Sequence, residues 1–228
     1  MARKHVVIVG AGGHGREVAE ILYSRKDQDF AVLGFVDEAT HLQKTSINGL
    51  PVLGDWSWFD TVEHDTVAVI CAVGLPEVRK QLVQRATEIG LSFCNAISPS
   101  ATISPAATIG QGVMVFPQVS VGPNCFVGDH TIINVGSTVS HDTRLEHYVT
   151  LNPGVHLAGN VSIGEGCNVG IGAGVIHQVS IGAWSIIGAG ASVVDDLPQN
   201  VTAVGLPARP ISTREKGWHE RVTGVTRQ

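Results

Sequence analysis

Residues 127–151 read VGDHTIINVGSTVSHDTRLEHYVTL, and every sixth residue of this stretch is Val, Ile or Leu. The same period continues in both directions without a missed position. It fits neither one face of an α-helix nor the two-residue alternation of a strand over this length. An internal repeat of this kind sets the architecture. Seventeen aliphatic anchors follow it: Ile97, Ile103, Ile109, Val115, Val121, Val127, Ile133, Val139, Leu145, Leu151, Leu157, Ile163, Val169, Val175, Ile181, Ile187 and Val193.

The period predicts a chain wound as a triangular prism, with one short strand on each of three sides and eighteen residues in each coil. The aliphatic anchors fill the interior of the prism. Small or short residues four positions after an anchor, such as Cys125, Thr131 and Ser137, fit its corners. Glycine directly after an anchor, as at Gly122 and Gly128, allows a tight turn or a close backbone approach.

This pattern is the hexapeptide repeat, and the chain resembles the left-handed parallel β-helix acyltransferases. The left hand is implied by the resemblance, because crossovers between parallel strands are usually right-handed. The same prism also occurs in a zinc hydratase and in accessory domains of sugar nucleotidyltransferases. The fold alone therefore does not identify the reaction.

The residues before the prism follow another pattern, in which strands alternate with helices. Such alternation predicts a small, Rossmann-like α/β domain around a parallel sheet. We expect strands at 5–9, 30–36 and 67–73 and helices at 16–25 and 77–89. The predicted domains are an α/β nucleotide-sugar-binding domain at 1–95, a β-helix acyltransferase domain at 96–198 and a C-terminal extension at 199–228. The last fifteen or so residues of the extension are polar and are expected to form a short helix or a loose tail.

Composition narrows the classes of partner. The chain has 228 residues, 43% of them hydrophobic, which supports a well-buried core. A net charge of −5 and the lack of a Lys/Arg cluster argue against a nucleic-acid-binding surface. The four cysteines show no paired spacing and are expected to be buried thiols. The apolar run 6–9 is too short for a signal peptide or a membrane span, so we expect a soluble, cytoplasmic protein with no membrane partner.

Gly10, Gly12 and Gly15 form the pattern G-x-G-x-x-G between the first expected strand and helix. Such glycines let the backbone approach a phosphate, and the start of the helix offers free amides. Asp37 and Glu38 end the second strand, where a carboxylate can hold a ribose or a base. The α/β part has about ninety residues, roughly half of a dinucleotide-binding fold, so a mononucleotide fits better. A tight turn without a ligand is the alternative.

The loop G-x-G-G-H-G ahead of a hexapeptide prism resembles the bacterial acetyltransferases that modify nucleotide-activated amino sugars. These include the UDP-4-amino-sugar N-acetyltransferases of the bacillosamine pathway, the GDP-perosamine N-acetyltransferases and the sialic-acid-pathway O-acetyltransferases. In that family the first domain binds the nucleotide sugar. His14 either hydrogen-bonds the phosphates or the sugar, or is only a structural residue of the loop. The resemblance implies a nucleotide-sugar site at Gly10, Gly12, Gly13, His14, Gly15, Asp37 and Glu38.

His141 lies two residues after the anchor Val139, on the outside of the prism, and Asp142 follows it. Gly159 comes one coil later and should stack against His141 at one strand spacing, roughly 4.8 Å. Asn134 sits at the preceding corner. An imidazole can act as a general base, a neighbouring carboxylate can orient it, and an amide N–H can bind an oxygen that gains charge. The group therefore suits acyl transfer, although Asp142 is alternatively a surface acid that is merely adjacent in sequence.

The family's motifs also match around these residues. Its Val-x-His-acid and Ala-Gly-Asn segments correspond to residues 139–142 and 158–160, and its asparagine to Asn134. The resemblance implies an acetyl-CoA-dependent N-acetyltransferase acting on the 4-amino group of a nucleotide-linked 4-amino-4,6-dideoxy sugar, of the GDP-perosamine or UDP-bacillosamine-precursor type. O-acetylation of a sialic-acid-type sugar and a non-catalytic, nucleotide-binding trimeric scaffold are the alternatives.

The resemblance further implies a homotrimer that holds the pantetheine arm of acetyl-CoA in a groove between neighbouring prisms. No metal is expected. His177 lies two coils beyond His141, roughly 10 Å away, which is too far for both to bind one ion. The zinc hydratases need a third histidine where this chain has Gly182. The residues expected to line the groove or to meet a phosphate of acetyl-CoA are Gly159, Gly172, Gly174, Ala189 and Arg209.

Overall fold

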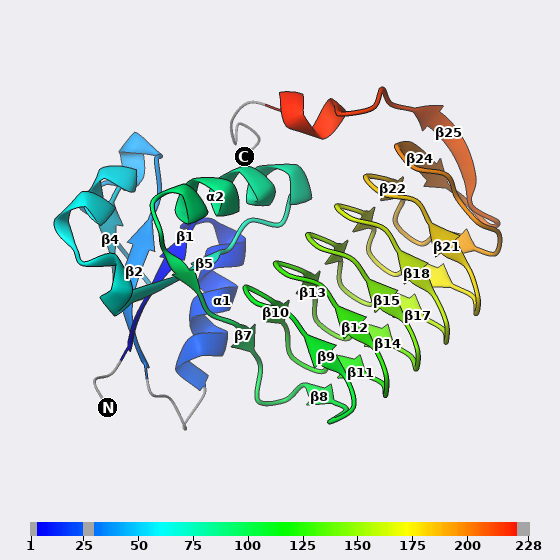
Figure 1. The fold of residues 1–228 in the computed structure, drawn as a ribbon, viewed down its shortest axis with the longest axis horizontal. Helices are drawn as coiled ribbons and strands as arrows, with labels where there is room; N and C mark the ends of the chain where they lie inside the picture. Colours follow the sequence, from blue (N-terminus) through cyan, green and yellow to red (C-terminus); the bar gives the residue numbers. More distant parts are fainter. Residues whose placement is uncertain (1–3, 25–29, 223–228) are drawn as a thin grey trace.

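The computed structural model describes residues 4–24 and 30–222. A small α/β unit lies at one end of the molecule, and a stack of coils extends away from it (Figure 1). The unit contains a six-stranded, mainly parallel sheet of order β3-β4-β2-β1-β5-β6. Its strands are β1 (Lys4–Val9), β2 (Phe30–Val36), β3 (Ser46–Ile47), β4 (Leu50–Gly54), β5 (Val67–Cys71) and β6 (Ser92–Phe93). Its helices are α1 (Gly13–Ser24) and α2 (Pro76–Glu88), with 3₁₀ turns η1 (Thr40–Leu42), η2 (Trp56–Thr61) and η3 (His64–Thr66).

β1 is the central strand of this sheet and is buried on both sides. Val6 and Ile8 join the hydrophobic cluster that contains α1, while the alternate residues of β1 join the cluster that contains α2. Burial on both sides explains an unbroken apolar run, which is typical of parallel sheets. The expected strands and helices are confirmed within a few residues at their ends. α1 begins earlier than expected, at Gly13, because Gly10 turns the chain with a φ of 103°; position 25 lies outside the described residues.

The coils form three faces of short parallel strands. Face 1 contains β7 (Ala96–Ile97), β10 (Met114–Val115), β13 (Ile132–Ile133), β16 (Thr150–Leu151), β19 (Asn168–Val169), β22 (Ile186–Ile187) and β24 (Val201–Val204), with the antiparallel β25 (Arg209–Thr213) at its edge. Face 2 contains β8 (Thr102–Ile103), β11 (Ser120–Val121), β14 (Thr138–Val139), β17 (His156–Leu157), β20 (Gly174–Val175) and β23 (Ser192–Val193). Face 3 contains β9 (Thr108–Ile109), β12 (Phe126–Val127), β15 (Arg144–Leu145), β18 (Ser162–Ile163) and β21 (Ser180–Ile181).

Neighbouring strands of a face pair eighteen residues apart, as Val121 pairs with Val139 and Val139 with Leu157. The anchors from Val115 to Val193 are each at most 3% exposed. The three earlier anchors are half-buried, because no coil precedes theirs. The predicted architecture, an α/β unit followed by a left-handed parallel β-helix, is confirmed.

The turns that join face 3 to face 1 form the row on which the α/β unit docks. We call Gly112, His130, Tyr148, Gly166 and Trp184 the docking row; each has a positive φ. The rings of His130 and Tyr148 stack with centroids 5.4 Å apart. α2 lies along this row, and α1 packs against β7, so that one hydrophobic cluster continues from the α/β unit into the prism.

The C-terminal extension begins with two strands, β24 and β25, which continue face 1. The expected short helix follows as a 3₁₀ turn, η4 (Trp218–Arg221), and positions 223–228 lie outside the described residues. The His219 ring stacks on Trp184 of the docking row with centroids 3.6 Å apart. Gln81 of α2 donates a hydrogen bond from Nε2 to the carbonyl of Val222 at 2.7 Å. Residues 199–222 therefore return from the far end of the prism to α2, as the red trace in Figure 1 shows.

Two expectations from composition concern the cysteines and the membrane. All four cysteines are free thiols, and Cys71, Cys125 and Cys167 are buried, whereas Cys94 is partly exposed. Within the two described ranges, no helix is both long enough and apolar enough to span a bilayer.

The buried His130 predicts a pH dependence of stability. Burial lowers its pKa to about 4 from an ordinary value of 6.5. Between these values the unfolded chain binds more protons than the folded one, so the free energy of unfolding falls as pH decreases. From pH 7 to pH 5 this one group should remove roughly 2 kcal/mol. In the His130→Asn variant, asparagine tolerates the positive φ and does not titrate. The free energy of unfolding of this variant, measured with urea at pH 7 and pH 5, should therefore fall by that much less than the wild-type value. Equal losses in both proteins would contradict this assignment.

Candidate active site

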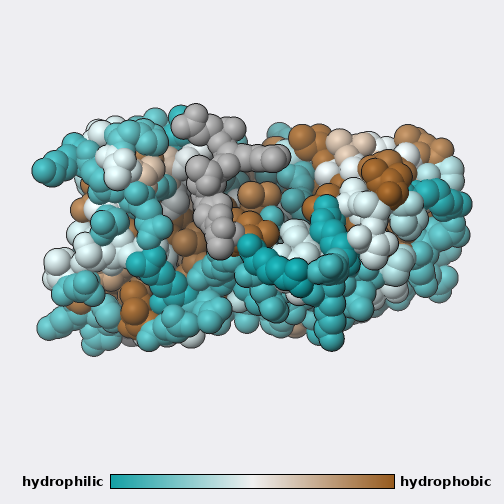
Figure 2. All heavy atoms as spheres, turned by 90° about the horizontal axis from the view of Figure 1, so that it is seen from above, coloured by the Kyte–Doolittle hydropathy of each residue, from teal (hydrophilic) through white to brown (hydrophobic). Residues whose placement is uncertain are grey.

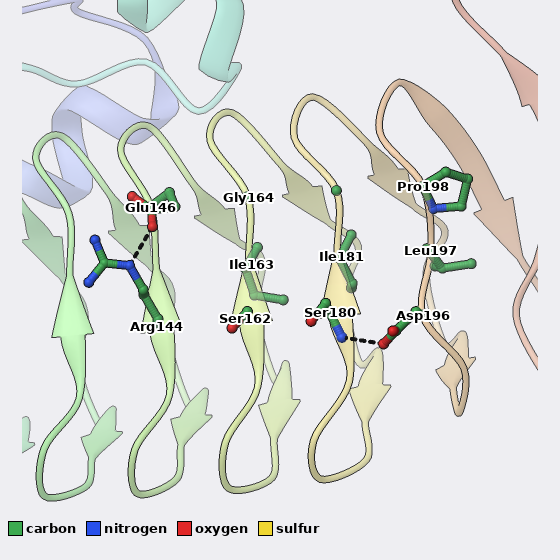
Figure 3. A pocket seen from close by; sticks show the side chains of 11 residues that line it. Arg144, Glu146, Ser162, Ile163, Gly164, Ser180, Ile181, Asp196, Leu197 and Pro198 are labelled. Carbon is green, nitrogen blue, oxygen red and sulfur yellow. Dashed lines mark hydrogen bonds and ion pairs between the residues drawn. The ribbon is translucent and has the colours of Figure 1, made fainter.

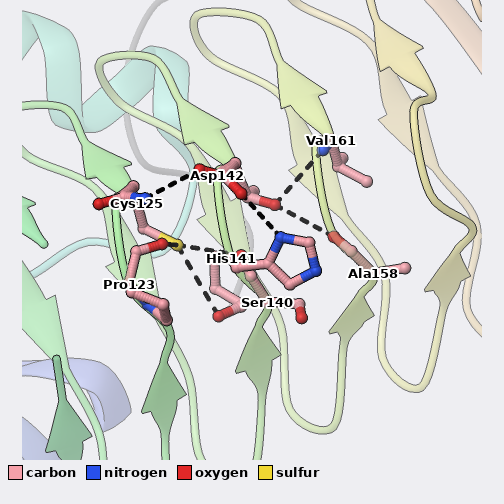
Figure 4. A network of polar contacts seen from close by, with 10 residues as sticks. Pro123, Cys125, Ser140, His141, Asp142, Ala158 and Val161 are labelled. Carbon is pink, nitrogen blue, oxygen red and sulfur yellow. Dashed lines mark hydrogen bonds and ion pairs between the residues drawn. The ribbon is translucent and has the colours of Figure 1, made fainter.

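His141 lies in the turn that joins β14 on face 2 to β15 on face 3 (Figure 4). Its Nδ1 is 2.8 Å from Oδ2 of Asp142, and Asn124 donates from Nδ2 to Oδ1 of the same carboxylate at 3.1 Å. The hydrogen bond from His141, and then that from Asn124, lower the pKa of the Asp142 carboxyl. Because a carboxylate only accepts hydrogen bonds, Nδ1 of His141 donates to Asp142, and in the neutral imidazole Nε2 is then the atom with a lone pair. The pair therefore orients a base.

Gly159 lies one coil farther and packs against the His141 ring. A Cβ on Gly159 would come within 2.6 Å of Nε2, so only glycine leaves room for the imidazole. The residue is buried, and its amide N–H has no hydrogen-bond partner within the described ranges. The equivalent amides of the two neighbouring coils, those of His141 and His177, also have no partner in these ranges. The structure therefore brings Gly159, with an unpaired amide, against the imidazole ring.

Asn134 does not join this group within one chain. It lies in the turn before β14, whereas His141 lies in the turn after it, so the width of face 2 separates the two residues. Its Oδ1 accepts a hydrogen bond from the Val135 amide at 2.8 Å.

A groove runs along face 2 past His141. It is lined by Thr138, His156, Gly174 and His177 among others. His156 was not predicted as a site residue; its Nδ1 lies 3.0 Å from Thr138 Oγ1, and this pairing needs the register of two coils. Among the residues that the structure describes, no three His, Cys, Asp or Glu side chains are arranged to hold a metal ion.

A second groove lies on face 3 (Figure 3). Arg144 and Glu146 on its floor form an ion pair, and Asp196 accepts a hydrogen bond from the Ser180 amide at 2.8 Å. No histidine lines this groove. Its three charged side chains each have a partner within the groove, so we assign the chemistry to the groove on face 2.

The residues expected to contact acetyl-CoA mostly border face 2. Gly174 lies on β20 in the groove, with open space where a Cβ would be, and Gly159 lies in the turn next to it. Gly172 and Ala189 lie in turns at the opposite edge of this face. Arg209 starts β25 and donates to Asp195 Oδ2 at 2.8 Å, so the structure gives this guanidinium a carboxylate partner.

The glycine loop lies at the carboxyl ends of β1 and β5, where the chain order of the sheet reverses. Such a switch point is where open α/β sheets bind ligands. A Cβ on Gly15 would clash with the Gly10 carbonyl, and one on Gly10 would lie 3.2 Å from the Ala72 carbonyl. At Gly12 a Cβ would meet no atom, and at Gly13 only the far end of Arg16 at 3.7 Å. Close packing thus requires glycine at positions 10 and 15. Gly12 and Gly13 instead leave open space beside the free amides at the start of α1.

Asp37 and Glu38 differ in their surroundings. Asp37 accepts from the Ala11 amide at 2.8 Å and from the Ala39 amide at 2.9 Å, so its carboxylate fixes the glycine loop. Glu38 is exposed and forms an ion pair of 2.7 Å with Arg85 of α2.

His14 is half-buried, and its ring centroid lies 5.0 Å from that of Phe116 in the first coils. Its Nε2 is buried without a hydrogen-bond partner in the described structure. Burial, and then the charge of Arg79, lower the pKa of His14 to about 4, so the ring is neutral near pH 7. It can therefore offer a ligand a hydrogen bond but no charge.

The residues on the other side of this switch point were not predicted as part of the site. They belong to the loop after β5, where Cγ2 of Val73 would lie 3.2 Å from a Cβ on Gly10 and a Cβ on Gly74 would meet no atom. We call the region between the two loops, outside the carboxyl ends of β1 and β5, the crevice. The dipeptide Gly74-Leu75 directly follows an apolar strand. Because ligands bind at the carboxyl ends of such strands where the strand order reverses, this dipeptide could have predicted the second side of the site.

The chain is similar to known sequences over part of its length. The family model of the PglD N-terminal domain matches residues 5–86. Over 83 residues the chain is 36% identical to an acyl-[acyl-carrier-protein]–UDP-N-acetylglucosamine O-acyltransferase of Burkholderia thailandensis, covering 36% of this chain and 32% of that protein. A UDP-3-O-acylglucosamine N-acyltransferase of Caulobacter sp. is 36% identical over 88 residues, covering 38% of this chain and 26% of that protein. The chain thus spans about a third or less of these curated relatives.

Two solved structures match nearly the whole chain. PerB from Caulobacter crescentus, in complex with CoA and GDP-perosamine, is 39% identical, with 91% of this chain and 97% of that chain covered and a TM-score of 0.85. The acetyltransferase domain of PglB from Neisseria gonorrhoeae, in complex with acetyl coenzyme A, is 35% identical, with 92% and 100% covered and a TM-score of 0.86. With its glycine loop, its prism and its histidine–glycine pair, the chain belongs to the hexapeptide-repeat sugar acetyltransferases.

Proposed function

We propose that this protein transfers the acetyl group of acetyl-CoA to the 4-amino group of a nucleotide-linked 4-amino-4,6-dideoxy sugar. The sugar is of the GDP-perosamine or UDP-bacillosamine-precursor type. The observation that carries the proposal is the His141 imidazole, oriented by Asp142 and packed on the free amide of Gly159. The similarity to PerB, solved with CoA and GDP-perosamine, supports the class of substrate. In this proposal residues 1–95 hold the nucleotide sugar and 96–198 carry the transfer.

The sugar nitrogen attacks the thioester carbonyl carbon, and a C–N bond forms. Nε2 of His141 accepts the proton that the amine loses, while Asp142 stabilises the resulting imidazolium. The carbonyl oxygen gains charge and accepts a hydrogen bond from the Gly159 N–H. When the tetrahedral intermediate collapses, the C–S bond breaks, and the CoA thiolate leaves with the proton from His141.

The site that we propose lies between two subunits of a homotrimer. Within one chain the glycine loop contacts Phe116 at one edge of face 2, while His141 lies at the other edge. Large apolar residues are exposed along both edges, at Val135, Ile171 and Ile176. Exposed apolar patches of this kind mark interaction surfaces. A neighbouring prism against face 2 would cover them and close the groove over acetyl-CoA.

Exposed apolar residues also gather at the far end of the prism. Figure 2 shows them over the end that carries β24 and β25, where Leu206 is 79% and Ile211 66% exposed. This end includes Arg209, so it is the second surface that we assign to acetyl-CoA or to a neighbouring subunit.

The first test is acetyl-CoA consumption with UDP- and GDP-linked 4-amino sugars, a sialic acid, and no acceptor. We expect turnover on one 4-amino sugar and its loss in His141→Ala, because this imidazole is the one that Asp142 orients and that packs against Gly159. His147→Ala is the matched control: this histidine lies 3.8 Å from Asp129 in a turn of the docking row and should keep full activity.

Other results would change the assignment. Turnover only with the sialic acid would make the protein an O-acetyltransferase. Nucleotide binding without turnover on any acceptor would favour a trimeric scaffold, and failure to bind CoA would exclude acyl transfer. The cytoplasmic location expected from the sequence stays a prediction.

Gly159→Ala should inactivate the protein without removing the base. The added Cβ overlaps the His141 ring, so the imidazole must move and the amide is shielded. We expect kcat to fall by about a hundredfold or more, the usual loss of an oxyanion donor. Gly174→Ala is the comparison, because its Cβ meets no atom within 4 Å; it should keep kcat and change only the KM for acetyl-CoA. Equal kcat values for the two variants would contradict this role of Gly159.

A further inference from the structure

Arg79 of α2 is completely buried, yet no carboxylate accepts a hydrogen bond from it in the described parts of the chain. Its guanidinium donates instead to five backbone carbonyls and one hydroxyl. The acceptors are the carbonyls of His130 (2.8 Å), Val73 (2.7 Å), Gly74 (3.1 Å), Tyr148 (2.7 Å) and Val149 (3.3 Å), and Oγ1 of Thr150 (3.0 Å).

These acceptors belong to two separate parts of the molecule. Val73 and Gly74 belong to the loop after β5, the crevice wall, which packs through Val73 against Gly10 of the glycine loop, whereas the other acceptors lie in two successive coils of the prism. Thr150 joins the two parts a second time, because its hydroxyl also donates to the Gly74 carbonyl at 2.9 Å. A single guanidinium and a single hydroxyl thus fix the crevice wall to the coils.

The arrangement requires an arginine. The guanidinium has five N–H donors in a rigid planar fork, whereas a lysine ammonium has three donors at one point. Burial lowers the pKa of Arg79 to about 9, so the group stays charged near pH 7. Its charge also acts on His14 in the crevice, where it is the second cause, after burial, of the lowered pKa.

We propose that Arg79 and Thr150 are positioning residues for the nucleotide-linked substrate. They hold the loop after β5 at a fixed place on the prism, so the crevice presents the sugar amine in a constant position relative to the groove on face 2. The inference rests on the proposed function, in which this crevice binds the nucleotide. Neither side chain contacts the reacting atoms.

The test compares Thr150→Val and Arg79→Lys with two controls. Thr150→Val keeps the side-chain shape and removes the hydroxyl that bridges Arg79 to Gly74, while Thr150→Ser keeps it. Lys80→Met removes the neighbouring 2.8 Å ion pair with Glu165, which joins α2 to the prism without touching the crevice wall. Steady-state kinetics give kcat and both KM values. Calorimetry gives the affinities for UDP, GDP and CoA separately.

We expect Thr150→Val and Arg79→Lys to raise the KM for the nucleotide sugar about tenfold, in line with the loss of one charge-assisted hydrogen bond. The KM for acetyl-CoA and the affinity for CoA should not change, and both controls should match the wild type. An unchanged KM for the nucleotide sugar in Thr150→Val would overturn the inference. An equal rise of the KM values for the nucleotide sugar and for acetyl-CoA would overturn it as well. If Arg79→Lys does not fold, Thr150→Val decides alone, since Arg79 keeps its carbonyl acceptors there.

Failure of the proposed function would look different. If the wild-type protein binds CoA but neither UDP nor GDP, the crevice is no nucleotide site, and both the proposed substrate and this inference fall. If the wild type binds a nucleotide and the variants bind it equally well, only the inference fails.

Discussion

The hydrogen-bond register between successive coils is the constraint on which the rest of the structure depends. Each turn bonds to the turn one coil away, as the Asn160 amide does to the His141 carbonyl at 3.0 Å. Residues eighteen positions apart are therefore neighbours on the outside of the prism. This register brings Gly159 under His141 and lines up the turns that receive α2. Inserting or deleting one residue in a coil would move Gly159 away from His141 and would break the row of turns that receives α2.

The two parts of the molecule meet through polar contacts as well as through apolar ones. α1 packs against the hydrophobic cluster of the prism. This apolar contact stabilises the association but does not fix the orientation of the α/β unit, because the hydrophobic effect is non-directional. Arg79 and Thr150 add directional bonds between the crevice wall and two coils. A buried charge is costly unless all of its donors are satisfied, so this contact allows only one placement of the α/β unit. In our proposal these bonds hold the crevice at a constant position relative to the groove on face 2.

The sequence predicted the contacts inside the prism correctly, because residues separated by one eighteen-residue coil are neighbours in space. The anchors, the three faces and the contact between His141 and Gly159 all follow from counting in eighteens. The glycine loop was also predictable, because a strand, G-x-G-x-x-G and a helix are consecutive in the chain. Asn134 shows the limit. It is close to His141 in sequence, yet the width of one face separates them, and counting along one chain does not show which surface of a neighbour meets it.

The sequence by itself determined the prism, its register, the histidine–glycine pair and the α/β unit with its glycine loop. Tertiary structure decided that Asp37 holds the Ala11 amide, that residues 199–222 return to α2, and that Arg79 fixes the crevice wall to the coils. The physical reason is the same in each case. Contacts within the repeat recur at a constant separation, whereas the contacts within the α/β unit, and those that join it to the prism and to the C-terminal segment, link residues 26 to 141 positions apart with no shared period.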